Sequence, residues 1–208
     1  MTKFLTFKHW QLFVLLMGLP MIFQFVLMGS VMTSRNPTIM YAAFPILMIL
    51  LIGLFFGWFY ALGTNLHKKL PETAKMNLTR FKIFLFIPVI YMLFLSLIMF
   101  SMYANISLGR QPSLAIFAGF VPLHLFSMFC IFYCLYFNAK ALKTVEWQNT
   151  VTFSDFAGEF FLIWFFPIGV WIIQPRINKL FDTTIDNENN QVLDSNIQET
   201  DERRRTNR

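Results

Sequence analysis

Few side chains in this chain of 208 residues could carry out chemistry, and most of them lie in or beside long apolar runs. His124 and Gln24 lie inside two of these runs, and Asn138 follows the run that holds His124. A histidine beside a second polar group could carry a proton or bind a ligand. The four longest runs contain no Asp, Glu, Lys or Arg, so we expect a neutral His124 that is hydrogen-bonded to a neighbour such as Gln24 or Tyr103. Gln24, His124 and Asn138 are therefore the candidate polar residues of the interior.

The sequence around these residues offers no motif for a metal or for catalysis. Cys130 and Cys134 share one face of a helix, but a zinc site would need two further ligands. Ser127 lies on the same helix as His124, without the orienting acid and the oxyanion hole that a serine nucleophile needs. We therefore expect no catalytic residue, no metal and no cofactor, and a protein that is not an enzyme.

A second pair of candidates, Glu159 and Arg176, flanks a strongly apolar segment near the end of the chain. Burial there could raise the pKa of the Glu159 carboxyl. The simpler interpretation is an interfacial carboxylate that accepts hydrogen bonds from nearby amides. A lipid- or quinone-handling enzyme would require Glu159 and Arg176 to converge with Asp155 and His67, which the sequence cannot show.

The elements that position these residues are long apolar helices. Hydrophobic residues make up 56% of the chain and charged residues 13%, whereas a soluble domain has about 25% charged residues. A helix needs roughly 20 apolar residues to cross about 30 Å of hydrocarbon. Four runs meet that length, and they predict membrane-spanning helices over residues 10–32, 40–62, 83–104 and 114–137.

A shorter apolar segment, Phe160–Ile173, follows the four runs and contains Pro167 and Gly169 at its middle. Thr152 and Asp155 have the spacing of a capping box and predict a helix that starts near Phe153. One placement for residues 153–173 is a re-entrant or interfacial segment, which we favour. The alternative is a short fifth crossing by residues 156–173.

The basic residues indicate how the chain is oriented. Nine of them lie at the ends of the runs that share a side with the N-terminus, against Arg35 and Arg110 on the other side. Cytoplasmic loops are enriched in Lys and Arg, so this bias predicts a cytoplasmic N-terminus and explains the net charge of +6. No basic stripe with interleaved aromatic residues points to nucleic acid.

Small and polar residues mark one face on each predicted span. Gly53, Gly57 and Ala61 recur every four residues in the second span. Such a pattern lets helices approach closely, either inside the bundle or at a homodimer seam. We expect these faces to point inward because polar side chains avoid lipid.

The stretch Thr152–Lys179, TFSDFAGEFFLIWFFPIGVWIIQPRINK, resembles the C-terminal end of small multi-pass membrane proteins of flavobacterium-like bacteria. That group has no assigned activity, so the resemblance implies a bacterial inner membrane and no particular chemistry.

The sequence as a whole predicts an all-α fold: a polytopic transmembrane four-helix bundle with a C-terminal re-entrant or interfacial helical segment. We divide the chain into this unit, residues 1–180, and a disordered polar cytoplasmic tail, residues 181–208. We expect a lipid-embedded, non-catalytic accessory subunit that binds a membrane protein partner or forms a homo-oligomer. The alternative is a small transporter or channel for a neutral or weakly polar solute.

Overall fold

The computed structural model describes residues 3–34, 38–107 and 114–181, and every regular element in these ranges is helical. The predicted tail lies outside the described residues from 182 onward. The helices in chain order are α1 Lys3–Thr6, α2 His9–Phe13, a π-helical turn Val14–Gly18, α3 Leu19–Ser34, α4 Thr38–His67, α5 Leu78–Ser107, α6 Leu114–Trp147, α7 Phe153–Trp164 and a last helix over residues 166–181.

Four helical stretches in the described residues are long and apolar enough to cross a membrane. The shortest has 23 residues, which at about 1.5 Å per residue exceeds roughly 30 Å of hydrocarbon. The predicted all-α, multi-pass architecture is therefore confirmed, and the chain is an integral membrane protein. The stretches are His9–Ser34, Pro45–His67, Leu78–Met102 and Gly119–Trp147.

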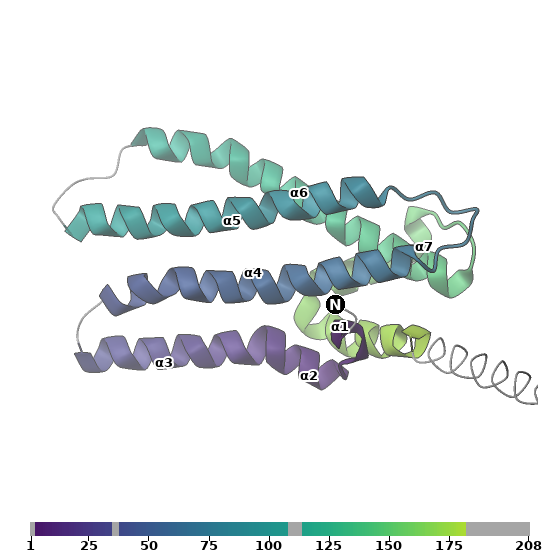
Figure 1. The fold of residues 1–208 in the computed structure, drawn as a ribbon, viewed down its shortest axis with the longest axis horizontal. Coiled ribbons are helices and arrows are strands. Elements are labelled where there is room, and N and C mark those ends of the chain that lie inside the picture. The colour runs from purple at the N-terminus through teal and green to yellow at the C-terminus, as the bar shows by residue number, and fades with distance from the viewer. Residues whose placement is uncertain (1–2, 35–37, 108–113, 182–208) are drawn as a thin grey trace, which may run out of the picture.

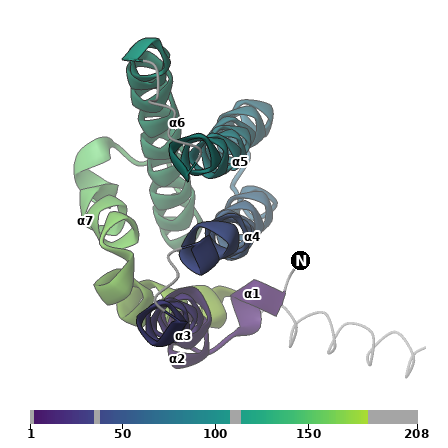
Figure 2. The ribbon, with the colours of Figure 1, turned by 90° about the vertical axis from the view of Figure 1, so that its left-hand side faces the viewer.

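The long helices run antiparallel to their neighbours (Figure 1). Seen along their axes, α3, α4, α5 and α6 follow one another, and α7 with the last helix fills the side between α6 and α2 (Figure 2). Ring contacts agree with this view. Trp164 of α7 packs against Phe132 of α6 with centroids 5.0 Å apart, and Trp171 of the last helix packs 5.6 Å from Phe13 of α2.

Two long helices extend well past the predicted ends of their spans. α5 starts at Leu78 instead of residue 83, and α6 ends at Trp147 instead of residue 137. An apolar run marks only the part of a helix that needs hydrocarbon, while the backbone hydrogen bonds continue beyond it. The extension of α6 keeps a core face, because Leu142 and Val145 are buried at helical spacing.

α7 begins as the capping box predicts and then ends abruptly. The Asp155 carboxylate accepts hydrogen bonds from the Thr152 backbone N–H at 2.8 Å and from its hydroxyl at 2.7 Å. The helix stops after Trp164, where Phe165 leaves helical geometry with φ −82° and ψ 56°. Pro167 lies in the first turn of the next helix, where a missing N–H costs no hydrogen bond. Residues 156–173 are therefore not one continuous crossing helix.

After Phe165 the chain reverses, so that α7 and the last helix form a hairpin. We call residues 153–181 the hairpin and residues 166–181 the returning helix. Arg176 of the returning helix comes back to within 2.6 Å of Glu159 in α7, and Leu180 accepts a hydrogen bond from Lys69 just past α4. The hairpin thus enters the bundle and leaves it at the same end (Figure 1), which is the arrangement that the favoured re-entrant placement requires.

Gly169 makes the tight reversal possible. A Cβ at this position would lie 1.6 Å from the backbone oxygen of Leu162, so no side chain fits where the two arms of the hairpin meet. Only glycine allows this approach.

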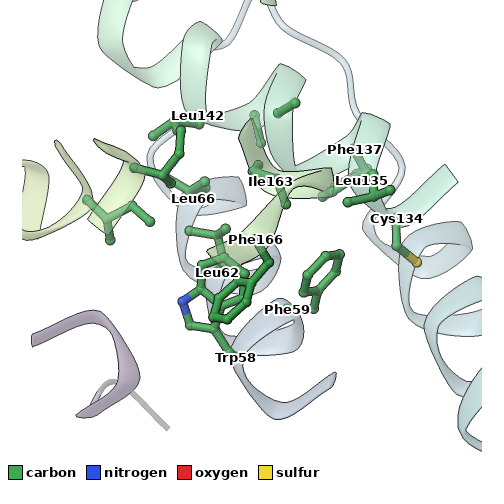
Figure 3. Close-up of a cluster of buried hydrophobic side chains, with 14 of the residues drawn as sticks. Trp58, Phe59, Leu62, Leu66, Cys134, Leu135, Phe137, Leu142, Ile163 and Phe166 are labelled. Atoms are coloured by element: carbon green, nitrogen blue, oxygen red, sulfur yellow. The ribbon is translucent and has the colours of Figure 1, made fainter. Parts of the chain in front are cut away.

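The hydrophobic core is concentrated at the hairpin end of the molecule. Phe166 packs its ring 5.4 Å from Trp58 of α4, and side chains from α4, α6 and the hairpin surround this pair (Figure 3). Farther from the hairpin the spans are mostly exposed, and residues 21–34 of the first span include none that is buried. The bilayer must cover the exposed surfaces. The labelled core residues are Trp58, Phe59, Leu62, Leu66, Cys134, Leu135, Phe137, Leu142, Ile163 and Phe166.

Replacing Gly169 with alanine should destabilise the hairpin, because the added methyl group would overlap the Leu162 carbonyl. Overpacking of this kind costs about 1–3 kcal/mol or more, so the thermal unfolding midpoint in detergent should fall. Gly158→Ala is the matched control, since a Cβ there meets nothing within 4 Å. Alanine should be neutral or mildly stabilising at that position. Equal midpoints for the two variants would contradict the close crossing at Gly169.

Candidate functional site

Four charged side chains from three helices meet where the returning helix reaches the end of α6. Lys143 and Glu146 come from α6, Glu159 from α7 and Arg176 from the returning helix. We call these four residues the charged cluster. Glu159 is the most buried of them, with 7% of its side chain exposed, and Arg176 is the least buried at 30%. The extension of α6 beyond its apolar run is what brings Lys143 and Glu146 to the hairpin.

Arg176 connects the two acids of the charged cluster. Its Nε donates to Glu146 Oε1 at 2.7 Å, and its Nη2 donates to the second Glu146 oxygen and to Glu159 Oε1. Lys143 Nζ donates to the same Glu159 oxygen at 3.1 Å. A bidentate guanidinium–carboxylate pair is among the stronger hydrogen-bonded contacts in proteins. Two cations neutralise two carboxylates here, so the arrangement suits a clamp between helices.

The charged cluster favours the ionised forms of Glu159 and Arg176. Burial alone would raise the pKa of Glu159, but hydrogen bonds from Arg176 and Lys143 outweigh it and leave this pKa below its ordinary value. The pKa of Arg176 is raised, mainly by its hydrogen bonds to Glu146. The raised Glu159 pKa that burial alone could give is therefore not observed, and the partners of this carboxylate are the cations Arg176 and Lys143 where the favoured interpretation expected amides.

Of the four residues that a lipid- or quinone-handling enzyme would need to bring together, only two are in contact. Glu159 and Arg176 are in contact, whereas Asp155 bonds to Thr152 at the start of α7. His67 Nε2 lies 2.9 Å from the backbone oxygen of Met76 in the loop after α4. The grouping of Glu159, Arg176, Asp155 and His67 is not observed as one site.

Beyond the charged cluster, the returning helix binds the N-terminal turn of the chain through two amide side chains. Gln174 Nε2 donates to the backbone oxygens of Phe4 at 3.1 Å and Phe7 at 3.0 Å. Asn178 Nδ2 also donates to Phe7, at 3.0 Å. These bonds satisfy carbonyls at the end of α1 that have no partner within so short a helix. The hairpin is thereby tied to the N-terminal end of the described chain.

The three candidate interior residues do not come together. Gln24 on α3 and His124 on α6 are exposed on the outer surface of the spans, and only Asn138 is buried. His124 Nδ1 lies 3.0 Å from the Tyr91 hydroxyl of α5. The hydrogen-bond partner of His124 is therefore Tyr91, whereas the sequence analysis expected a neighbour such as Gln24 or Tyr103. The expected inward orientation of Gln24 and His124 is wrong, because helical projection gives the shared face of a stripe but not the direction in which it points.

The small-residue pattern of α4 is only partly a packing face. Gly53 is exposed and a Cβ there would meet nothing within 4 Å, whereas a Cβ on Gly57 would touch the Phe4 ring at 3.6 Å. Ala61 is fully buried. The closest approach between α4 and another helix at a glycine is at Gly63, which the sequence analysis did not single out. A Cβ on Gly63 would lie 2.4 Å from the Phe81 ring of α5. Gly63 stands two residues past the repeat, and its spacing gave no signal.

Asn138 lies fully buried beside this contact, with its Oδ1 2.8 Å from the position of a Gly63 Cβ. Neither polar atom of its side chain has a hydrogen-bond partner among the described residues. A buried amide without a partner costs about 1–3 kcal/mol. Asn138 is therefore a strained part of the core and not part of the charged cluster.

Two pockets adjoin the hairpin. A polar pocket of about 720 Å³ opens beside the charged cluster, and its lining includes Lys69, Glu146 and Arg176. Several helices end at this pocket, and helix C-termini attract cations, which accounts for its basic side chains. A second pocket of about 400 Å³ lies at the tip of the hairpin and has an apolar lining that includes Trp164 and Pro167.

In the part of the chain that the structure describes, no three His, Cys, Asp or Glu side chains lie close enough to hold a metal ion. The two cysteines, Cys130 and Cys134, are free and buried in α6.

Sequence reasoning found Glu159 and Arg176 but missed their partners Lys143 and Glu146. Both partners fall in the polar stretch that follows the fourth apolar run, which was not expected to be helical. Their spacing of three residues, on a helix that continues the run, was the signal that could have found them.

No family model, no curated protein and no solved structure matches this chain.

Replacing Glu159 with alanine should destabilise the protein strongly, because Arg176 and Lys143 would remain partly buried without their shared acid. Removing one partner of a buried ion pair costs about 3–5 kcal/mol, and partial exposure of Arg176 places this site at the lower end of that range. The measurement is the unfolding midpoint in detergent. Glu72→Ala, at an exposed loop position, should leave the midpoint unchanged. An unaltered midpoint for Glu159→Ala would contradict the role of the charged cluster.

Acid should weaken the fold through the same carboxylate. A lowered folded-state pKa means that Glu159 contributes stability above its ordinary pKa of 4.5, and that this contribution is lost as pH falls through the lower folded value. The unfolding midpoint should therefore be flat from neutral pH to about pH 5 and fall below it. Glu159→Gln should reduce this acid-induced decrease of the midpoint. The part of the decrease that remains should come from Asp155, whose pKa is also lowered. An identical pH profile for Glu159→Gln would contradict the assignment.

Proposed function

We propose that the protein is a non-catalytic membrane subunit that binds a second membrane protein, or another copy of itself, through the outer surface of its spans. The observation that carries this proposal is the exposure of Gln24 and His124, which both lie within membrane-spanning stretches. Polar side chains in membrane-spanning helices normally face protein or water and not lipid. Partner helices that pack against the outer surfaces of α3 and α6 would cover these two residues and supply further hydrogen bonds.

Two exposed small residues of the spans also fit helix–helix contacts. Gly53 on α4 and Gly119 on α6 are also exposed, and a Cβ on either would meet nothing within 4 Å. Small residues on an exposed span surface allow another helix to approach closely.

The placement in a bacterial inner membrane with a cytoplasmic N-terminus belongs to this proposal. The loop between α4 and α5, which contains Lys68 and Lys75, lies at the end of the bundle where the hairpin enters and leaves (Figure 1). An excess of Lys and Arg marks the cytoplasmic side. The resemblance of residues 152–179 to proteins of flavobacterium-like bacteria supports the same membrane.

A small transporter or channel for a neutral or weakly polar solute is the second candidate. The break at Phe165 is the observation that favours it, since interrupted helices are common at the substrate sites of transporters. The polar residues on which this candidate first rested lie on different surfaces of the bundle, so the partner-binding function has the stronger support.

The test of the proposal is the mass of the intact particle after extraction from native membranes in mild detergent. We expect a particle heavier than the 24.5 kDa chain, and weaker association in Gln24→Leu and His124→Leu. A loss of about 0.6 kcal/mol per contact corresponds to a roughly threefold weaker association for each variant.

Two controls separate an interface from a folding defect. Tyr91→Phe removes only the bond that His124 makes within the chain. Thr33→Val removes an exposed hydroxyl that already bonds to Gly29 of its own helix. Both controls should keep the wild-type particle mass. A bare monomer in the wild type, or an equal loss of association in the controls, would contradict the partner-binding function.

A further inference from the structure

The apolar pocket at the tip of the hairpin is a place where the first three spans and the hairpin meet. Its volume is about 400 Å³, and every residue that lines it is apolar. Trp164, at its edge, is 47% exposed, so the pocket opens on the outer surface that the bilayer covers. The walls include Leu16 and Met17 of the π-helical turn, Met48 of α4, Met92 of α5, and Trp164 and Pro167 of the hairpin.

Two irregular stretches of backbone border this pocket. One is the π-helical turn Val14–Gly18, which precedes Pro20. Proline lacks the N–H that residue 20 of an α-helix would donate to Leu16. The other is the chain reversal at Phe165. Turns of π-helix occur often at functional sites, and non-helical backbone at membrane depth is tolerated where it lines a cavity or is buried in protein.

We propose that this pocket binds one acyl chain of a bilayer phospholipid. An empty apolar cavity costs free energy in proportion to its volume, and water would find no hydrogen-bond partner on an apolar wall. The bilayer supplies hydrocarbon chains at the open side, beside Trp164. Met17, Met48 and Met92 are flexible side chains that adapt to the irregular shape of such a chain.

The site is separate from the surface proposed for the protein partner. It lies between the spans and the hairpin, whereas Gln24 and His124 are not among its lining residues. A bound chain would link the hairpin tip to the first three spans, where the protein alone leaves a gap. The lipid would thus be a component of the folded protein, bound at one position.

The test fills the pocket with a larger side chain. Met48→Trp and Met92→Trp should each reduce the phospholipid that remains bound after detergent washing at least tenfold, as measured by native mass spectrometry. The matched controls are Ile49→Trp and Ile90→Trp, next to these positions on the exposed faces of the same helices, with Ile49 57% and Ile90 65% exposed. The wild type and both controls should retain one phospholipid per chain.

A second readout distinguishes a filled pocket from a misfolded protein. Complete delipidation should lower the unfolding midpoint of the wild type and of the controls, but not that of a folded variant whose own tryptophan fills the pocket. If the tryptophan variants do not fold, phenylalanine at the same four positions takes their place. The proposal is overturned if the wild type retains no stoichiometric lipid, if the controls lose lipid equally, or if the bound mass is an isoprenoid or a peptide.

Discussion

The bridge that Arg176 makes between Glu146 and Glu159 is the contact on which the rest of the architecture depends. It joins α6, α7 and the returning helix in one hydrogen-bonded group, and it lies at the only end of the bundle with a dense core among the described residues. Without it Arg176, whose side chain is only 30% exposed, would be partly buried with no acid to pair with. A buried cation of that kind is costly, so the bridge determines where the chain can return.

The reversal at Phe165 explains why the core lies at one end of the molecule. Phe166 and Ile163 are brought into the space between α4 and α6 (Figure 3), and Gln174 reaches back to α1. No part of the hairpin packs between the opposite halves of the spans, and these halves present mostly exposed apolar side chains. Stability is therefore built at the charged end, while the other end offers surface to lipid or to another helix.

Sequence alone predicted the elements whose signal is local. Apolar length identified the four spans, and the Thr152–Asp155 pair located the start of α7. The sequence could not predict whether a given face of a span points to lipid or to protein, because both environments accept apolar side chains. Gln24 was therefore expected inside the bundle, although it lies on the outer surface. Glu146 was missed because the polar stretch after the fourth apolar run was not expected to be helical. Gly63 was missed because close packing depends on the partner helix.

The most direct measurement is the membrane side on which the two ends of the hairpin lie. In a background of Cys130→Ala and Cys134→Ala, single cysteines at Thr150 and Lys179 would be labelled with an impermeant maleimide from each side of sealed vesicles. Ser34→Cys, at the opposite end of a span, serves as the reference. The account predicts that Thr150→Cys and Lys179→Cys react from the same side and Ser34→Cys from the other. Labelling of Thr150→Cys and Lys179→Cys from opposite sides would show that residues 153–181 cross the membrane and would contradict the re-entrant hairpin.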